Sequence, residues 1–259
     1  MATYNKRGYK APKPKEVNDV EPTEEGFDGH STTEEVFDSL DQGASKTEEW
    51  VEKNQKPIFI VVIAIAVVTI GYMLYSKMLV EPKEDEAANE MFQAEQYFDQ
   101  AVNSQTAKDS LFNLSLNGGE GKLGFLGIIE NYSGTDAANL AHYFSGMAYL
   151  NTGKYKDAVA QFDAFSTDDD ILKAMATGAT GDAFAQLGQN EDALEYYVKA
   201  ANESKNELTT PRFLFKAGEA ALALDKKAEA SKHFKEIKDN YSTSQEGVSI
   251  DAYIAMTED

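Results

Sequence analysis

The sequence predicts an all-α protein, with a single transmembrane helix followed by a solenoid of repeated helical hairpins. Three observations lead to this fold class. Residues 58–76 are uncharged and apolar, one spacing of glycine, alanine and aromatic residues recurs in the C-terminal half, and no convincing run of alternating polar and apolar residues indicates a sheet. The 259 residues are therefore expected to comprise a tail (1–56), a membrane segment (57–80) and a helical-repeat domain (81–259).

The charge of the chain is strongly negative. Its 24 Lys and Arg residues are outnumbered by 44 Asp and Glu residues, for a net charge of −20. Nucleic acid is therefore disfavoured as a partner, because phosphates require cationic contacts. The first 15 residues are basic, whereas 16–56 and 81–259 are acidic. The chain has no cysteine, which excludes disulfides, thiolate metal sites and a cysteine nucleophile.

The tail, residues 1–56, is polar and contains prolines, and it is expected to be mostly disordered. One stretch, STTEEVFDSLDQG (31–43), begins with Ser31 and Glu34 in the spacing of a helix capping box. It could form a short helix that docks on a cytoplasmic partner, or a transient helix without one. The basic first 15 residues could contact anionic lipid or simply be solvated.

The membrane segment is PIFIVVIAIAVVTIGYMLYS, and its uncharged part runs from Ile58 to Ser76. As a helix this part would be about 28 Å long, close to the roughly 30 Å hydrocarbon core of a lipid bilayer. Three lysines closely precede the span and two follow it. The positive-inside rule then places the N-terminus in the cytoplasm and residues 81–259 in the periplasm, with the span in a bacterial inner membrane.

Three helices are expected between residues 84 and 132. The second, within KDSLFNLSLNGG, should end at Gly118 and Gly119, and LGFLGIIENY forms the third. The first has an apolar stripe of roughly helical period, which consists of Ala88, Met91, Phe92, Ala94, Phe98 and Val102.

A repeated spacing follows, with glycine, aromatic, glycine, alanine and aromatic residues in a fixed order. The first copy is Gly146, Tyr149, Gly153, Ala158 and Phe162. The second copy is Gly181, Phe184, Gly188, Ala193 and Tyr197. A weaker third copy keeps Gly218, Ala230 and Phe234 and has Asp225 at the position of the second glycine.

This spacing resembles the tetratricopeptide repeat, a helix–turn–helix unit. The small residues let the two helices of a hairpin approach closely, the second glycine permits the turn, and the aromatic residues fill the space between hairpins. A single hairpin cannot bury its apolar face, so the units stack. Repeats are expected at about 139–172, 174–207 and 211–244, with a capping helix at 245–257.

Tetratricopeptide stacks line a binding groove with the first helix of each hairpin, and the glycines fix which positions would face it. The expected positions lie three before, one after and five after each glycine. They are Tyr143, Met147 and Asn151; Gly178, Asp182 and Gln186; Phe215, Glu219 and Ala223. The apolar members would anchor a partner and the polar members would select it, unless the apolar members are core between repeats.

No pattern in the sequence indicates catalysis. His30, His142 and His233 are not spaced for a zinc site; the second is expected to pack in the interior and the third to lie on the surface. The acidic triplet at 168–170 lacks the ligand spacing of a calcium loop, and GGEGKLG lacks the ending of a phosphate loop. We therefore expect a protein that is not an enzyme and that needs no cofactor or metal.

The order of cytoplasmic tail, membrane helix and translocated helical-repeat domain resembles the YfgM family, ancillary subunits of the bacterial Sec translocon. The resemblance covers roughly Trp50 to the C-terminus and is greatest to versions from Bacteroidetes, in the stretches DSLFNLSLNG, GFLGIIENYSGTDAANLAHYF and DDDILKAMATGATGDAFAQLGQ. It implies as partners the SecYEG channel, a PpiD-like membrane-anchored chaperone and, as candidate clients, emerging secretory proteins. The alternatives are a periplasmic scaffold for envelope assembly or cell division, unconnected to Sec, and a membrane-tethered enzyme regulator.

Overall fold

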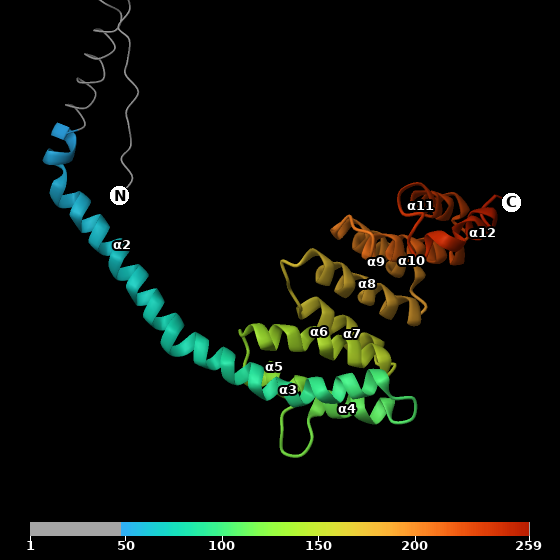
Figure 1. The fold of residues 1–259 in the computed structure, drawn as a ribbon, viewed down its shortest axis with the longest axis horizontal. Helices are drawn as coiled ribbons and strands as arrows, with labels where there is room; N and C mark the ends of the chain where they lie inside the picture. The colour runs from blue at the N-terminus through green and yellow to red at the C-terminus, as the bar shows by residue number, and fades with distance from the viewer. Residues whose placement is uncertain (1–47, 259) are drawn as a thin grey trace, which may run out of the picture. The chain divides into compact units, whose positions relative to one another are not determined.

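The computed structural model describes residues 48–258, and within them every regular element is a helix (Figure 1). An isolated bridge joins Gly119 to Lys122. The chain divides into two compact units, Met1–Val67 and Val68–Asp259. The short helix expected at 31–43 and the basic first 15 residues lie outside the described residues.

The apolar helix α2 runs from Gln55 to Tyr75 and has no buried residue. A π-helical turn, η1 (Ser76–Val80), follows and continues into α3 (Glu81–Asn103). Among the described residues, this continuous helix is the one that is long and apolar enough to cross a membrane. The expected span from Ile58 lies in α2 up to Tyr75, and its last residue, Ser76, begins the π-helical turn.

Within the second unit, α3 packs against α4 (Lys108–Asn117), α5 (Phe125–Asn131) and α6 (Asp136–Asn151). The stripe expected on α3 is partly wrong, because Ala88, Phe92 and Val102 are exposed. Each of them follows a buried residue by one position, which rotates it by about 100° around the helix. The buried row is Ala87, Met91, Ala94, Phe98 and Ala101.

Aromatic rings fill the centre of this first part. The ring of Phe98 lies edge-on to those of Phe112, Phe125 and Phe144, with centroids 5.3, 6.1 and 5.1 Å away. These rings come from α3, α4, α5 and α6, so they join four helices. As expected, α4 ends at a glycine, Gly118, whose φ of 86° places it in the left-handed region.

Side chains of the first turn of α3 form hydrogen bonds with the main chain at the start of α6. The Glu84 carboxylate accepts hydrogen bonds from the N–H groups of Asp136 (2.7 Å) and Ala137 (2.9 Å). The Lys83 ammonium group donates to the carbonyl of Ser133 at 2.8 Å. A carboxylate is favourable there because it satisfies unpaired N–H groups at the positive end of the helix dipole.

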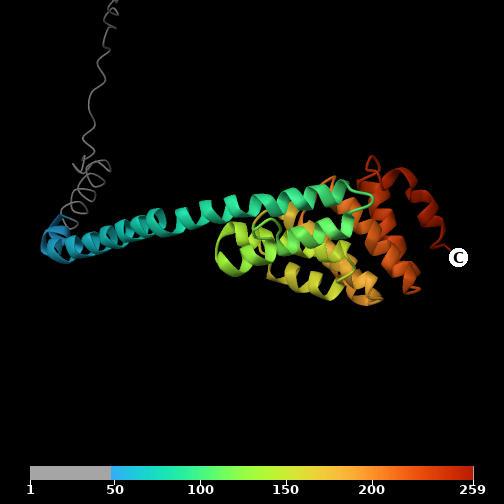
Figure 2. The same ribbon diagram turned by 90° about the horizontal axis from the view of Figure 1, so that it is seen from below.

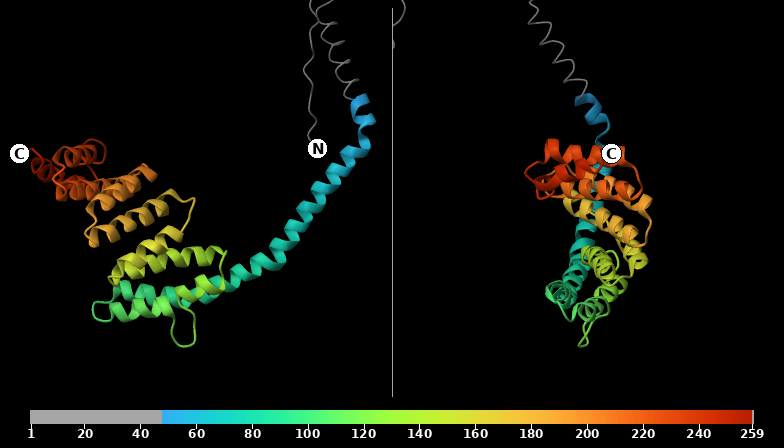
Figure 3. Two further views of the ribbon diagram at one scale, coloured as in Figure 1. Left: turned by 180° about the vertical axis from the view of Figure 1, so that it is seen from behind. Right: turned by 90° about the vertical axis from the view of Figure 1, so that its right-hand side faces the viewer.

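Three helical hairpins follow, and they contact one another in chain order (Figures 1 and 3). They are α6 with α7 (Tyr155–Ala164), α8 (Asp170–Gln186) with α9 (Asn190–Glu203), and α10 (Thr209–Ala223) with α11 (Lys227–Asn240). Figures 1 and 3 show α3 and α4 at one end of this series and the last helices at the other, and Figure 2 views the series from below, with α3 and α4 in front of the middle hairpins. Instead of the long capping helix expected at 245–257, a 3₁₀ turn, η2 (Gly247–Ser249), precedes the short helix α12 (Ile250–Ala255).

The repeated glycines lie where an aromatic ring of the same hairpin crosses the first helix. A methyl group at these glycines would lie only 2.6, 2.8 and 2.2 Å from the ring, for Gly146 on Phe162, Gly181 on Tyr197 and Gly218 on Phe234. The close approach expected at the glycines is therefore present, but its partner is the ring. The expectation that these three rings only fill the space between hairpins is wrong, because each packs on the glycine of its own hairpin. The repeated alanines Ala158, Ala193 and Ala230 are buried, while Tyr149 and Phe184 are half-buried against the core.

The turns of the three hairpins share one backbone conformation. Gly153, Gly188 and Asp225 have φ angles of 75°, 74° and 58°, all in the left-handed region. Glycine adopts this region freely, whereas a residue with a Cβ atom is strained there. The third copy of the repeat is therefore a true structural equivalent of the other two, although it lacks the glycine.

Candidate functional site

The three expected apolar anchors pack against neighbouring helices. The ring of Tyr143 contacts those of Phe144, Phe162 and Phe165. Met147 packs against two neighbouring apolar clusters. The ring of Phe215 contacts Phe234 at 5.9 Å and Tyr253 at 4.6 Å. All three side chains are half-buried, and their contacts are those of core residues.

The expected polar positions lie together along one hollow of about 600 Å³, which we name the polar groove. Its walls come from the first helices of the three hairpins, α6, α8 and α10, with contributions from α7 and α9. The residues that line it are Leu150, Asn151, Tyr155, Asp182, Ala185, Gln186, Asn190, Tyr197, Lys216, Glu219 and Ala220.

A three-residue contact forms the floor of the polar groove and joins α8, α9 and α10. The carboxylate of Asp182 accepts hydrogen bonds from the Tyr197 hydroxyl at 2.7 Å and from the Lys216 ammonium group. That ammonium group also lies 5.6 Å from the centre of the Tyr197 ring. Burial, and then the charge of Asp182, raise the pKa of Tyr197 above its usual value, so the phenol stays a donor at neutral pH.

The sequence did not single out Lys216 or assign the Tyr197 hydroxyl a role. Tyr197 was recognised as a repeat aromatic, but the repeat pattern does not distinguish tyrosine from phenylalanine. Lys216 precedes Glu219 by three residues and therefore lies on the same face of α10. That spacing was the signal that could have placed Lys216 in the groove.

Several groups in the polar groove keep unused hydrogen-bonding capacity. The Asn151 amide N–H donates to the carbonyl of Met147 at 2.9 Å, which leaves its oxygen as an acceptor. The Gln186 oxygen accepts from the Tyr155 hydroxyl at 3.3 Å, which leaves its NH₂ group as a donor. No cation of the described residues lies within ion-pair distance of Glu219. Partial loss of water raises the pKa of this carboxyl, and the charge of Lys216 opposes the shift.

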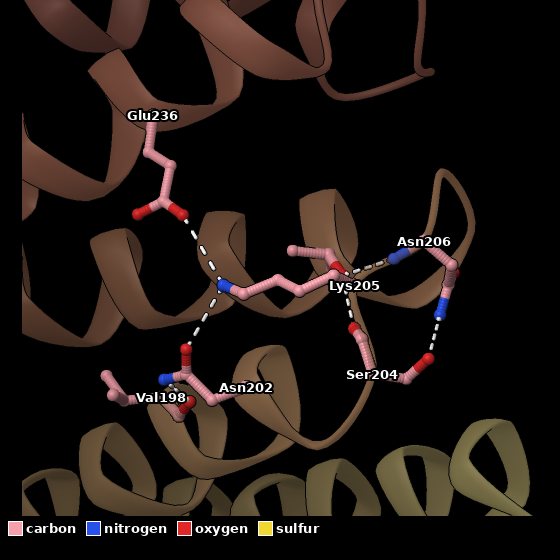
Figure 4. Close-up of polar contacts among 7 residues, drawn as sticks. Val198, Asn202, Ser204, Lys205, Asn206 and Glu236 are labelled. Atoms are coloured by element: carbon pink, nitrogen blue, oxygen red, sulfur yellow. Dashed lines mark hydrogen bonds and ion pairs between the residues drawn. The ribbon is translucent and has the colours of Figure 1, made fainter. Parts of the chain in front are cut away.

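A second polar cluster, at the connection between α9 and α10, is satisfied internally (Figure 4). The Asn206 side-chain oxygen accepts from the N–H groups of Leu208 and Thr209, each at 2.7 Å, and its NH₂ group donates to the Ser204 hydroxyl at 3.0 Å. Lys205 donates to Asn202 at 3.1 Å and pairs with Glu236 of α11. These bonds fix the start of α10 and offer little to a ligand.

A larger hollow of about 800 Å³ lies at the N-terminal ends of α6 and α8, but its amide and imidazole groups are engaged. Asn139 exchanges two hydrogen bonds with the main chain of Ser166, at 2.7 and 3.0 Å. His142 was expected to pack in the interior, and its ring is half-buried. Its Nδ1 atom lies 2.8 Å from the side-chain oxygen of Gln161. The polar groove is therefore the better candidate for binding.

The prediction that His233 lies on the surface is wrong. Its side chain is buried, with 6% exposed, on the same face of α11 as Ala230 and Ile237. Neither ring nitrogen has a hydrogen-bond partner in the described structure. Burial lowers the pKa of this imidazole, so the neutral form is favoured. Among the described residues, no group of His, Cys, Asp and Glu side chains is arranged to hold a metal ion.

In the part of the chain that the structure describes, the fold and the groove define a helical domain in which three hairpins share one polar hollow. Residues 126–252, which include all three hairpins, match the model of a family described as T7SS, ESX-1 secretion system protein EccA1, N-terminal domain. No curated protein matches the sequence.

The match overturns the family expected from the sequence. EccA1 belongs to a different family from YfgM, so the expected role as an ancillary subunit of the Sec translocon is wrong. The expected partners, SecYEG, a PpiD-like chaperone and secretory clients, are wrong for the same reason. The stretches that suggested YfgM supply ordinary core contacts here, such as Phe112 and Leu116 in DSLFNLSLNG. The match gives no support to the tetratricopeptide name either, and the structure establishes that residues 48–258 are all-helical with one long apolar helix.

Proposed function

We propose that residues 81–259 form a membrane-anchored scaffold that binds a segment of a partner protein in the polar groove. The observation that supports this most strongly is the hollow lined by the first helices of three successive hairpins, with donors and acceptors left unused. A polypeptide main chain carries both kinds of group at every residue and suits such a surface. The finer fold class, a tetratricopeptide-type solenoid, is part of this proposal and rests on the repeated spacing.

The setting we propose is a protein-secretion apparatus at a bacterial inner membrane. The description of the matched family names a secretion-system protein, which supports this setting. The apolar helix α2 would be the anchor, and the lysines that precede it favour a cytoplasmic N-terminus and a periplasmic position for residues 81–259. A non-enzymatic role rests on the sequence, which has no recognisable nucleophile–base or phosphate-loop pattern.

The absence of cysteine from the chain allows one experiment to test both the groove and the topology. Gln186→Cys places a single thiol in the groove, and Glu195→Cys places one on an exposed position of α9 outside it. A membrane-impermeant maleimide added to spheroplasts should label both variants. A thiol-to-amine cross-linker should then join a partner protein to the Gln186→Cys variant in much higher yield than to the control variant.

The two readouts fail in different ways. Labelling that appears only after the membrane is permeabilised would overturn the periplasmic position of the domain. Equal cross-linking from the two cysteines, or none from the groove, would overturn the groove as the binding site.

A further inference from the structure

The charged side chains of the polar groove do not balance. Its lining contains two acids, Asp182 and Glu219, and one base, Lys216. Lys216 is committed to Asp182 by a direct ion pair, and Tyr197 donates to the same carboxylate oxygen. One formal negative charge therefore remains, and it belongs to Glu219.

Glu219 lies where an incoming group can reach it. Its side chain is exposed on α10, one helical turn beyond Lys216, at the border of the hollow. The surrounding protein removes part of its water, and its pKa is raised as a result. A carboxylate in such a position gains from a cation that replaces the lost hydration with a charge-assisted hydrogen bond.

The charge of the whole domain acts in the same direction. Residues 81–259 contain 31 acidic and 15 basic side chains, and thus a net charge of −16. A field of this sign attracts cationic segments and repels acidic ones before contact is made. Asn151 and Gln186, the neutral amides of the groove, offer hydrogen bonds to any main chain and do not distinguish one charge from the other.

We propose that the polar groove selects partner segments that carry a lysine or arginine, and that Glu219 is the residue that determines this preference. The proposal rests on the proposed function, because it assumes that the groove binds a polypeptide. Asp182 stays paired with Lys216 and holds the floor in place, so the partner's cation meets Glu219 alone.

The test is a selection of random twelve-residue peptides displayed on phage, with the full-length protein in mild detergent as the target. Peptides selected by the native protein should be enriched in Lys and Arg. Those selected by Glu219→Gln should lose most of the enrichment, and those selected by Glu219→Lys should lose the rest of it, although the domain keeps its net negative charge. Glu195→Gln removes an exposed acid outside the groove and should leave the enrichment unchanged. A selected basic peptide should bind Glu219→Gln about tenfold more weakly than the native protein.

A further variant, Gln186→Trp, separates the two proposals. If Gln186→Trp abolishes the binding of the selected peptides, but these peptides show no enrichment in Lys and Arg, the role of Glu219 is overturned and the groove remains the binding site. Peptides that bind Gln186→Trp as well as they bind the native protein, or a selection that yields none, would overturn both proposals. Equal thermal unfolding of the native protein and the variants confirms that each is folded.

Discussion

The second and third hairpins, α8–α9 and α10–α11, follow one spacing and use it differently. In each, a glycine of the first helix meets a ring sixteen residues later, Gly181 with Tyr197 and Gly218 with Phe234. The Tyr197 hydroxyl reaches Asp182 at the floor of the polar groove. Phe234 has no such group, and its ring is fully buried. The spacing thus fixes the contact between the glycine and the ring in both hairpins. Only in the second hairpin does a hydroxyl on that ring also take part in the polar groove.

Two further positions differ between these hairpins. Fifteen residues after the glycine, the second hairpin has Tyr196, whose ring lies 5.1 Å from that of Phe184, and the third has the unpaired, buried His233. At the turn, the second has Gly188 and the third has Asp225 in the same left-handed conformation. We therefore expect the third hairpin to tolerate substitution less well where its glycine meets the ring. We also expect its unpaired histidine and its left-handed aspartate to lower its stability.

The largest loss of stability is expected where the glycine of the first helix meets the ring of the second. Gly218→Ala would place a methyl group 2.2 Å from the fully buried Phe234 ring, whereas Gly181→Ala would place one 2.8 Å from Tyr197. Overpacking should make Gly218→Ala less stable by about 2 kcal/mol, with a smaller loss for Gly181→Ala. Thermal unfolding of the full-length protein, followed by circular dichroism, measures both. Adding Phe234→Leu to Gly218→Ala should restore part of the loss, and equal losses from the two alanine variants would contradict the comparison.

An intermediate effect is expected from His233 as pH falls. Its pKa is lowered in the folded state, while an unfolded histidine titrates near pH 6.5. The folded state is therefore fully favoured above about pH 6.5, and stability is lost as pH falls from there through the folded pKa. The slope is at most about 1.4 kcal/mol per pH unit, since one proton is taken up. Glu229 and Glu236 partly oppose the shift, and Lys232 adds to it.

Thermal unfolding between pH 7.5 and 5 in the native protein and in His233→Leu measures this contribution. The variant should lose less stability over the range. His142→Gln, which leaves His233 in place, is the control variant. Parallel curves for the native protein and His233→Leu would show that the imidazole does not take up a proton on unfolding.

The sequence predicted the features that depend on local spacing. The left-handed turns follow from positions fixed within one hairpin, and even Asp225 was placed by its distance from Gly218. The close approach at the glycines was also expected, but the contact of each glycine with the ring sixteen residues later was not. The polar members of the groove were found in the same way, because positions one and five after each glycine lie on one face of a helix. The apolar members were harder to place, because Tyr143 and Phe215 interact with rings of other helices that no local spacing reveals.

The features that were missed depend on which side of a helix meets the rest of the protein. His233 shares a row with Ala230 and Ile237, so its burial could have been read from the helical period. On α3 the apolar residues cover more than one face, and only contact with α4, α5 and α6 selects the buried row. The family was missed because the order of a tail, a span and a helical domain describes an architecture and says nothing about partners.

The smallest change in stability is expected at the turns, whose backbone conformations are nearly the same in the two hairpins. The N–H groups of Gly188 and Gln189 bond to the carbonyls of Ala185 and Phe184, each at 3.0 Å. In the third hairpin, the N–H groups of Asp225 and Lys226 bond to Leu222 and Ala221 at 3.0 and 2.9 Å. Because the hydrogen bonds are the same, the main difference between the turns is the Cβ atom of the residue in the left-handed region.

Asp225→Gly should therefore stabilise the protein by about 0.5 kcal/mol, and Gly188→Asp should destabilise it by a similar amount. The relief of left-handed strain, roughly 1 kcal/mol, is partly cancelled by the greater freedom of glycine in the unfolded chain. Urea unfolding of both variants beside the native protein gives the two differences with opposite signs. If Asp225→Gly were the less stable protein, the Asp225 side chain would have to supply a bond that outweighs the strain, and the two turns would be equivalent in shape but not in energy.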